Sequence, residues 1–393
     1  MTSPSTTTSS DWRRRLHSVL GIPPTSGNEL VVLRNGNEIF PAMLRAIDNA
    51  RATVDIVTFV YWEGEIGKTF ADRLAAAARR GCRVRVLLDA VGAHQIRPDF
   101  VESMTSAGCD VKWFRPIIKG GTPSIGEVNR RTHRKILVCD GEIAFTGGVG
   151  IADEWEGDAR DETEWRDTHV SVRGPAVAGL QAAFFDNWAD ALDTVFDAHE
   201  EPSAAMDATG HSDCLVLRGS AEAGASDIRR LLLTLVQCAE RRIRIASAYF
   251  NPDDELVDVL CAAVDRGVEV QLLFPGTHAD KRFVQLNGES DYERLLDAGV
   301  DIRTYERSMM HVKVITVDGS VASIGSANLN ERSTELDEEC NLIVFDPDVV
   351  DVLDSHFDDD LELCEVLDAQ RWKDRSLLQK VGETLTGAVD RWL

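Results

Sequence analysis

Two histidines, each followed two residues later by a lysine and then by an aspartate, are the side chains of this sequence best suited to chemistry. Both copies read His-x-Lys-x4-Asp. In each copy the histidine and the lysine share one side of an apolar β-type run, so a nucleophile or base lies beside a fixed cation. One copy would be unremarkable, but two copies, each followed by a strand and a small-residue turn, indicate a single active site. The two sets are His133, Lys135 and Asp140, and His311, Lys313 and Asp318.

The composition is that of a soluble globular protein with room for two domains, because 44% of its 393 residues are hydrophobic and 27% are charged. The formal net charge of −24 argues against a general nucleic-acid-binding protein, since such binding depends on clustered lysine and arginine. The eight cysteines form no C-x-x-C pair, which favours free thiols in a reducing compartment. We therefore expect no metal ion and no other cofactor. No apolar run reaches about 18 residues, so no membrane span is expected.

The chain contains an internal duplication. Residues 78–88 return in similar form at 263–273, and residues 106–112 return at 297–303. The first half is expected to contain a strand at 54–60, an alanine-rich helix at 67–80 and a strand at 83–89, an order typical of a parallel sheet. Each half supplies one of the two histidines. The active site is therefore expected where the halves meet.

The duplication divides the chain into five segments. We expect a disordered, basic N-terminal segment at 1–27, a first domain at 28–200, a linker at 201–213, a second domain at 214–366 and an amphipathic helix at 367–393. The last segment is predicted to be helical because its leucines and valines fall within an arc of about 120°. Such a helix could bind a membrane surface or pack on the body of the protein, and the sequence leaves both possibilities open.

The paired motifs, trailed by Gly-Gly in one copy and by Gly-Ser-x-Asn in the other, resemble those of the phospholipase D superfamily. From about residue 28 to about residue 366, the chain looks most similar to the cardiolipin synthase branch. This resemblance implies an α/β fold of two tandem phospholipase D-like α/β/α repeats. They would form one pseudo-twofold, bilobal unit with the active site at their interface. Many members carry two N-terminal membrane spans, and here this sequence departs from them.

The resemblance also implies a role for each motif residue. His133 is the expected nucleophile, which forms a phosphohistidine, and His311 is the expected general acid and then base. Lys135 and Lys313 are expected to hold the phosphoryl oxygens. Imidazoles suit the two histidine roles because, with an ordinary pKa near about 6.5, they attack when neutral and donate a proton when charged.

Other residues are implied to orient the histidines or to bind the substrate. Asp167 is expected to orient His133, and Glu339 to orient His311, each by a hydrogen bond to the second ring nitrogen. The remaining substrate-binding residues implied by the resemblance are Asn328, Ser326, Gly147 and Gly148.

Two features qualify this assignment. Asp140 and Asp318 each precede a glycine, so both are also interpreted as structural turn residues. The family usually has Gly-Gly-x-Asn after the first motif, whereas this chain has glycine at position 150, so a side-chain donor is missing on that side. Trp155 and Trp165 are interpreted as core aromatics rather than as site residues.

The leading functional hypothesis is a phosphatidyltransferase that makes cardiolipin or a related phospholipid from phosphatidylglycerol. The alternatives are a phospholipase D that transfers phosphatidyl to water, a nuclease, which the negative charge disfavours, and an inactive scaffold, which two intact motifs disfavour. The expected partners are anionic phospholipids and a membrane surface, not nucleic acid, and the expected location is cytoplasmic, on the inner face of the cell membrane. The headgroup phosphates are expected to meet a cluster of cations, namely Arg130, Arg131, Arg134, Lys135, Lys281, Arg282 and Arg332.

Overall fold

The structure is a computed structural model. It describes residues 7–116, 129–192, 207–220, 227–279, 291–330 and 332–368, and the backbone at 118–119 and 122–123. The predicted C-terminal helix lies almost entirely outside the described residues, as do Lys281 and Arg282. Within the described ranges, no helix combines the length and the apolar character that crossing a bilayer requires.

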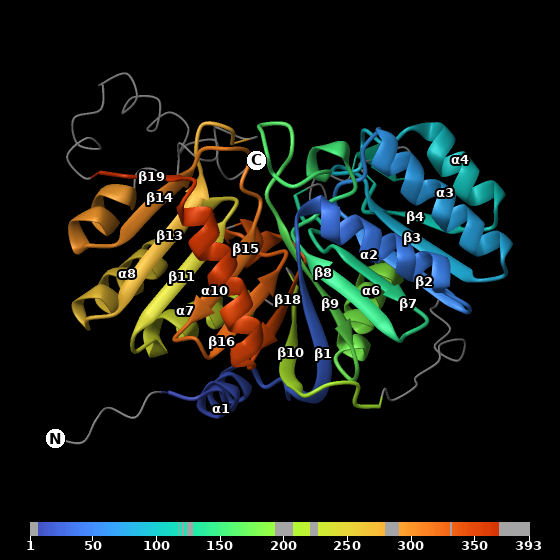
Figure 1. The fold of residues 1–393 in the computed structure, drawn as a ribbon. Coiled ribbons are helices and arrows are strands. Elements are labelled where there is room, and N and C mark those ends of the chain that lie inside the picture. The colour runs from blue at the N-terminus through green and yellow to red at the C-terminus, as the bar shows by residue number, and fades with distance from the viewer. Residues whose placement is uncertain are drawn as a thin grey trace.

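One 15-stranded sheet runs through the whole molecule (Figure 1). From the outer edge to the centre, the first half contributes β4 (Asp110–Phe114), β3 (Arg83–Asp89), β2 (Thr53–Thr58), β7 (Ile136–Cys139), β8 (Ile143–Gly147), β9 (Thr168–Arg173) and β1 (Thr25–Arg34). The second half contributes β14 (Asp301–Tyr305), β13 (Glu269–Pro275), β11 (Arg242–Ser247), β15 (Lys313–Val317), β16 (Val321–Gly325), β18 (Glu339–Val344) and β10 (Ser212–Gly219) in the same order. This repetition confirms the two tandem α/β repeats that the sequence predicts.

The two halves join where β1 pairs antiparallel with β10. The outermost strand, β19 (Cys364–Val366), extends the second half beyond β14. Two short pairs complete the strands, β12 (Phe250–Asn251) with β17 (Leu329–Asn330), and β5 (Ile118–Lys119) with β6 (Thr122–Pro123). The predicted linker ends inside β10, so its last residues belong to the sheet.

Helices cover both faces of the sheet. On the outer face, α2 (Asn35–Asn49), α3 (Glu65–Arg79) and α4 (Pro98–Ser106) cover the first half, while α7 (Asp227–Cys238) and α8 (Asp254–Asp265) cover the second. On the other face, α6 (Val177–Asp190) and α10 (Pro347–Leu361) share a core to which both halves contribute. The strand residues alternate between these cores; Val138 faces the shared core, and Leu137 faces the outer one. The predicted strand at 83–89 has the bounds of β3, and β2 and α3 lie within two residues of their predicted bounds.

The N-terminal segment contains a helix, α1 (Ser9–Leu20), so the prediction of disorder is wrong for these residues. A capping box starts the helix, because the Thr8 side chain accepts from the Asp11 N–H while the Asp11 carboxylate accepts from the Thr8 N–H. Trp12, Leu16 and Leu20 are buried in the outer core of the second half, beside α7. Their i, i+4, i+8 spacing places them on one side of the helix. The polar composition of the segment made this apolar stripe hard to recognise in the sequence.

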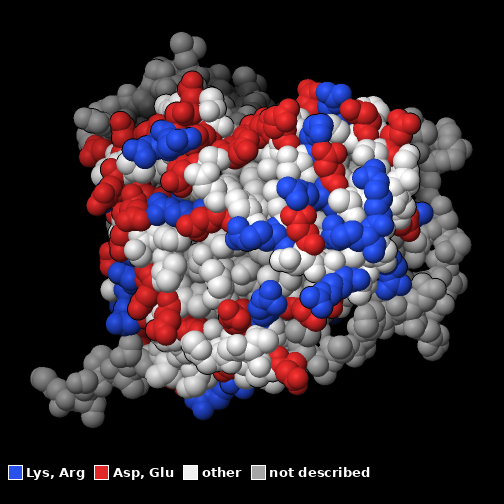
Figure 2. All heavy atoms as spheres, turned by 45° about the vertical axis from the view of Figure 1, so that its right-hand side comes forward, with Lys and Arg blue, Asp and Glu red and all other residues white. Residues whose placement is uncertain are grey.

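Acidic and basic side chains are distributed unevenly over the face shown in Figure 2. Figure 2 shows red Asp and Glu side chains along the left of one face, and blue Lys and Arg side chains interspersed with red ones further right. Many of the arginines lie in ion pairs, such as Arg73 with Asp48 and Arg294 with Asp254. Such exposed pairs contribute little to stability, about 0–1 kcal/mol each.

Candidate active site

The two motifs occupy equivalent places in the two halves. His133 lies three residues before β7, which follows Lys135 directly, and His311 lies two residues before β15, which begins at Lys313. β7 and β15 hold the same position in the strand order of their halves. All four side chains are buried or nearly so, with His133 9% and His311 5% exposed.

Backbone hydrogen bonds tie each motif to the opposite half of the molecule. The His133 N–H donates to the Glu338 carbonyl at 2.9 Å, and the His311 N–H donates to the Arg166 carbonyl at 2.7 Å. Thr132 and Glu338 form a parallel β-bridge, as do Arg166 and Met310. Glu339 directly follows Glu338, and Asp167 directly follows Arg166. These two residues are the predicted orienting carboxylates. The pseudo-twofold arrangement therefore brings each carboxylate to the histidine of the other half.

The side-chain pairing is the reverse of the one that the sequence predicts. The His133 Nδ1 lies 3.0 Å from Glu339 Oε1, and the His311 Nδ1 lies 2.8 Å from Asp167 Oδ2. The prediction that Asp167 orients His133 and Glu339 orients His311 is therefore wrong. Order along the chain assigned each carboxylate to the preceding histidine, whereas the Thr132–Glu338 and Arg166–Met310 bridges join residues of opposite halves.

Both carboxylates are ionised in this environment. Burial raises the pKa of Glu339, but the adjacent His133, through its charge and its hydrogen bond, outweighs burial and lowers the pKa to about 2. Burial also opposes ionisation of Asp167, and the hydrogen bond and charge of His311 again produce a net lowering of the pKa. Two buried anions therefore lie behind the two imidazoles.

Both imidazoles are neutral near pH 7. Burial lowers the pKa of His133 to about 4 and that of His311 to about 4, and the neighbouring lysine of each motif adds to the effect. Each Nδ1–H donates to its carboxylate, so each Nε2 is the unprotonated nitrogen, and the Lys313 Nζ lies 3.2 Å from the His311 Nε2. A neutral, oriented imidazole is the form that attacks phosphorus.

The two motif lysines form a buried electropositive centre. The Lys135 Nζ donates to the His133 carbonyl at 2.7 Å, and the Lys313 Nζ donates to the His311 carbonyl at 2.8 Å. Burial, together with the Lys313 ammonium, lowers the pKa of Lys135 to about 7. The positive charges of Lys135 and Lys313 repel each other, and a bound phosphate anion would relieve this repulsion.

Ser326, Asn328 and the two glycines lie at the turn that follows each motif hairpin. The Ser326 hydroxyl donates to Glu339. Asn328 is 4% exposed, and among the described residues its carboxamide oxygen has no hydrogen-bond partner. Gly148 makes room for a protein group, because a Cβ there would lie 2.3 Å from Asp167 Oδ1. At Gly147, a Cβ would lie 2.5 Å from His169 Nδ1, so these glycines admit β9 and its side chains.

Comparisons with known proteins identify the family. The sequence model described as "Cardiolipin synthase, PLD-like domain" matches residues 43–165 and 232–361, one match in each half. The chain belongs to this family. Cardiolipin synthase 2 of Bacillus anthracis is 33% identical over 358 residues, which are 91% of this chain and 69% of that protein. Cardiolipin synthase of Geobacillus kaustophilus is 32% identical over 95% of this chain and 74% of that protein.

The fold also matches a solved structure. Phosphatidylserine synthase of Haemophilus influenzae aligns with a TM-score of 0.70 over 97% of both chains, at 14% sequence identity. At this identity the likeness concerns the fold alone. It agrees with the two tandem repeats seen in the sheet.

Asp140 and Asp318, the aspartates of the two motifs, bind backbone N–H groups rather than groups of the active site. Asp140 accepts hydrogen bonds from the backbone N–H groups of residues 51, 52 and 53, and Asp318 accepts from those of residues 240, 241 and 242. Both have positive φ angles, 54° and 55°. They lie at the end of each motif strand that points away from its histidine. Their place supports the interpretation as turn residues rather than as groups that touch the substrate.

Asp140→Ala and Asp318→Ala should therefore reduce stability and spare catalysis. Each leaves three backbone donors without their acceptor, so we expect the free energy of unfolding to fall by about 1–3 kcal/mol. The kcat of the folded protein should change by less than about twofold. Denaturant unfolding followed by assays on the folded fraction measures both. A loss of kcat greater than about 100-fold without a change in stability would instead make these aspartates catalytic.

Gly150, where the family usually has asparagine, is enclosed by neighbouring side chains. A Cβ there would lie 2.7 Å from the Val60 Cβ and 3.2 Å from the Trp155 ring. The Trp155 ring centroid lies 5.0 Å from that of His311, and the Trp165 ring centroid lies 5.6 Å from it. Sequence reasoning placed both tryptophans in the core, and the glycine at position 150 was the signal that could have drawn attention to Trp155.

Arg131 and Arg134, two of the cations predicted to bind headgroups, instead form buried hydrogen bonds within the protein. Arg131 is buried and donates to both oxygens of Asp89, at 3.1 and 3.0 Å. Arg134 is buried as well, and its guanidinium donates to the Glu339 and Ala183 carbonyls. The prediction that these two arginines hold headgroups is wrong, because both already satisfy buried acceptors. Arg130 is exposed, and Arg332 is partly exposed beside Asp337 and Asn129.

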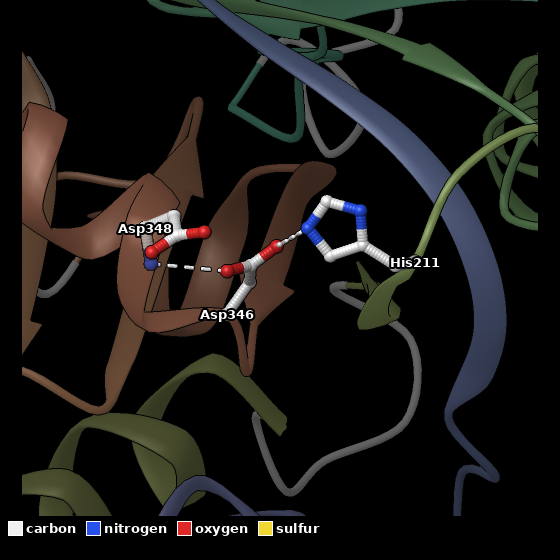
Figure 3. Close-up of side chains that lie close together, drawn as sticks. All are labelled: His211, Asp346 and Asp348. Carbon is white, nitrogen blue, oxygen red and sulfur yellow. Dashed lines mark hydrogen bonds and ion pairs between the residues drawn. The ribbon is translucent and has the colours of Figure 1, made fainter.

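His211, Asp346 and Asp348, none of which belongs to the histidine motifs, form a group with the spacing of a metal site (Figure 3). In the described part of the chain, His211, Asp346 and Asp348 place one ligand atom each within 4.8 Å of one another. The Asp346 carboxylate caps α10 by accepting from the Asp348 N–H at 3.0 Å, and it also accepts from the Ser212 hydroxyl. These contacts explain the group as a helix cap with an exposed histidine beside it.

Proposed function

We propose that this protein is a phosphatidyltransferase that forms cardiolipin from two molecules of phosphatidylglycerol. The observation that carries the proposal is the pairing of two neutral, carboxylate-oriented imidazoles with two buried lysines, in a member of the cardiolipin synthase family. The family relatives described above are named cardiolipin synthases. Phosphodiester exchange requires a nucleophile, an acid and fixed positive charge, and this site holds all three.

In the first half-reaction, the His133 Nε2 attacks the phosphorus of one phosphatidylglycerol. The bond from phosphorus to the headgroup glycerol oxygen breaks, and His311 donates a proton to that oxygen. Phosphatidyl is then held on His133, and free glycerol leaves. The negative phosphodiester between Lys135 and Lys313 raises the pKa of the nearby imidazoles on binding, which supplies His311 with its proton.

In the second half-reaction, a headgroup hydroxyl of another phosphatidylglycerol attacks the phosphohistidine. His311, now neutral, takes the hydroxyl proton, the nitrogen–phosphorus bond breaks, and cardiolipin forms. The burial of both histidines limits the access of water to the intermediate, which favours an alcohol acceptor over hydrolysis. We place the protein at the inner face of the cell membrane as a cytoplasmic, peripheral enzyme, because its substrates are anionic membrane phospholipids.

Purified protein supplied with phosphatidylglycerol vesicles tests the proposal. We expect release of glycerol and formation of cardiolipin in equal amounts, with phosphatidate a minor product, as measured by lipid mass spectrometry and a glycerol assay. Phosphatidate and glycerol as the main products at every lipid density would instead establish a phospholipase D. His133→Ala is the control, because it keeps the lipid-binding surface and removes the nucleophile.

A further inference from the structure

Each orienting carboxylate receives a second side-chain hydrogen bond, and the two halves supply it differently. In the second half, the Ser326 hydroxyl donates to Glu339. The equivalent position in the first half is Gly148, where even a Cβ would collide with Asp167. The donor comes instead from Trp155, whose indole Nε1–H lies 2.9 Å from Asp167 Oδ2.

Trp155 is held firmly in this position. Its side chain is 2% exposed, and it ends a short 3-10 helix, η1 (Asp153–Trp155). Its ring occupies the space beside Gly150 and stands edge-on to His311, with an interplanar angle of 83°. Trp155 therefore contacts both members of the Asp167–His311 pair, and it fills the space that a side chain at position 150 would need.

We propose that Trp155 is a positioning residue that holds Asp167 ionised and aimed at His311, in place of the hydroxyl that serves Glu339 in the other half. The two donors differ chemically. A serine hydroxyl both donates and accepts, and Ser326 also accepts from the Cys340 N–H at 3.0 Å. An indole N–H only donates, so it favours the carboxylate form of Asp167 over the protonated form, which is the weaker acceptor.

The second hydrogen bond to the carboxylate therefore serves a different reaction step in each half. This consequence rests on the proposed roles of the two histidines. A fixed, ionised Asp167 stabilises the imidazolium form of His311, the form that protonates the leaving glycerol. Loss of the indole N–H should slow the proton-transfer steps of His311 and leave the attack by His133 nearly unchanged. Loss of the Ser326 hydroxyl should slow the attack by His133.

Trp155→Phe, which keeps an aromatic ring and removes the N–H, tests this inference. We expect kcat with phosphatidylglycerol to fall about 10- to 100-fold, the range for losing a hydrogen bond to a charged group, with KM nearly unchanged. With a p-nitrophenyl phosphodiester of the same lipid, whose leaving group needs no proton, the rate of the p-nitrophenol burst that reports capture on His133 should fall less than about threefold. Ser326→Ala should lower the rate with both substrates to a similar extent.

Trp62→Phe is the matched control. The Trp62 ring lies 6.2 Å from that of Trp155, and its indole N–H donates to the Gly92 carbonyl rather than to Asp167. Trp155→His, which restores an N–H near the position of the indole nitrogen, should recover part of the lost rate. It also keeps the inference testable if Trp155→Phe does not fold.

Equal rates for Trp155→Phe and Trp62→Phe would overturn the inference, and so would equal losses on both substrates for Trp155→Phe. A Trp155→His variant that folds but is no faster than Trp155→Phe would also count against it. Failure of the proposed function has a different signature. In that case phosphatidylglycerol would yield phosphatidate and glycerol instead of cardiolipin, whatever the tryptophan variants do.

Discussion

His133→Ala should abolish phosphatidyl transfer, with kcat falling by at least about 10⁴-fold, as expected when a covalent nucleophile is removed. His311→Ala should also lose turnover of phosphatidylglycerol, because glycerol is a poor leaving group without a proton donor. It should nevertheless still form the covalent intermediate from a p-nitrophenyl phosphodiester. Intact-protein mass spectrometry after rapid quenching should show one added phosphatidyl group on His311→Ala and none on His133→Ala.

The two variants also decide the order of the roles. The motifs are nearly symmetric, and both imidazoles have pKa values lowered to about 4, so protonation alone does not distinguish them. If the added mass appeared on His133→Ala and mapped to His311, the nucleophile would belong to the second half. Thermal unfolding of both variants is the control, because each substitution leaves its carboxylate buried without its partner.

The sequence predicted the elements that local pattern determines. The apolar run of β3 and the alanine-rich stripe of α3 are short-range signals, and both appear close to their predicted bounds. The duplication predicted the site at the junction of the halves, because each copy supplies only one histidine. The family resemblance supplied the motif residues that the structure brings together there.

The sequence could not show which side chains meet across the halves. The contacts of His133 with Glu339 and of His311 with Asp167 depend on the bridges that join the two halves beside the motifs, and no spacing along the chain encodes these bridges. The burial of charged side chains could not be predicted from the sequence for the same reason. Arg131 reads as a surface cation in the sequence, yet its partner Asp89 lies at the end of a distant strand.

α1 and Trp155 were missed for different reasons. The helix has a polar composition, and its three buried residues gain a partner only when the second half folds. Trp155 looks like an ordinary core aromatic until the glycine at position 148 is set against the serine at position 326. The comparison of the two halves, rather than either half alone, shows that one donor has replaced another.

The crossed pairing predicts which half-reaction each carboxylate serves. Glu339→Gln should slow formation of the phosphohistidine from a p-nitrophenyl phosphodiester by about 10³- to 10⁴-fold, because an amide no longer stabilises the charge that develops on His133 and favours the wrong tautomer. Asp167→Asn should leave this capture step nearly unchanged and slow the turnover of phosphatidylglycerol to a comparable extent, since it acts on His311. Rapid-quench measurement of p-nitrophenol release reports the capture rate directly.

The opposite pattern, with Asp167→Asn slowing capture and Glu339→Gln sparing it, would restore the pairing within each half. Asp140→Asn is the control for introducing an amide near the motif, because this carboxylate binds backbone N–H groups and no imidazole. The difference between the two site variants follows from geometry alone. Each carboxylate contacts one imidazole, the two imidazoles have separate tasks, and only the capture step is independent of a proton from His311 when the leaving group is activated.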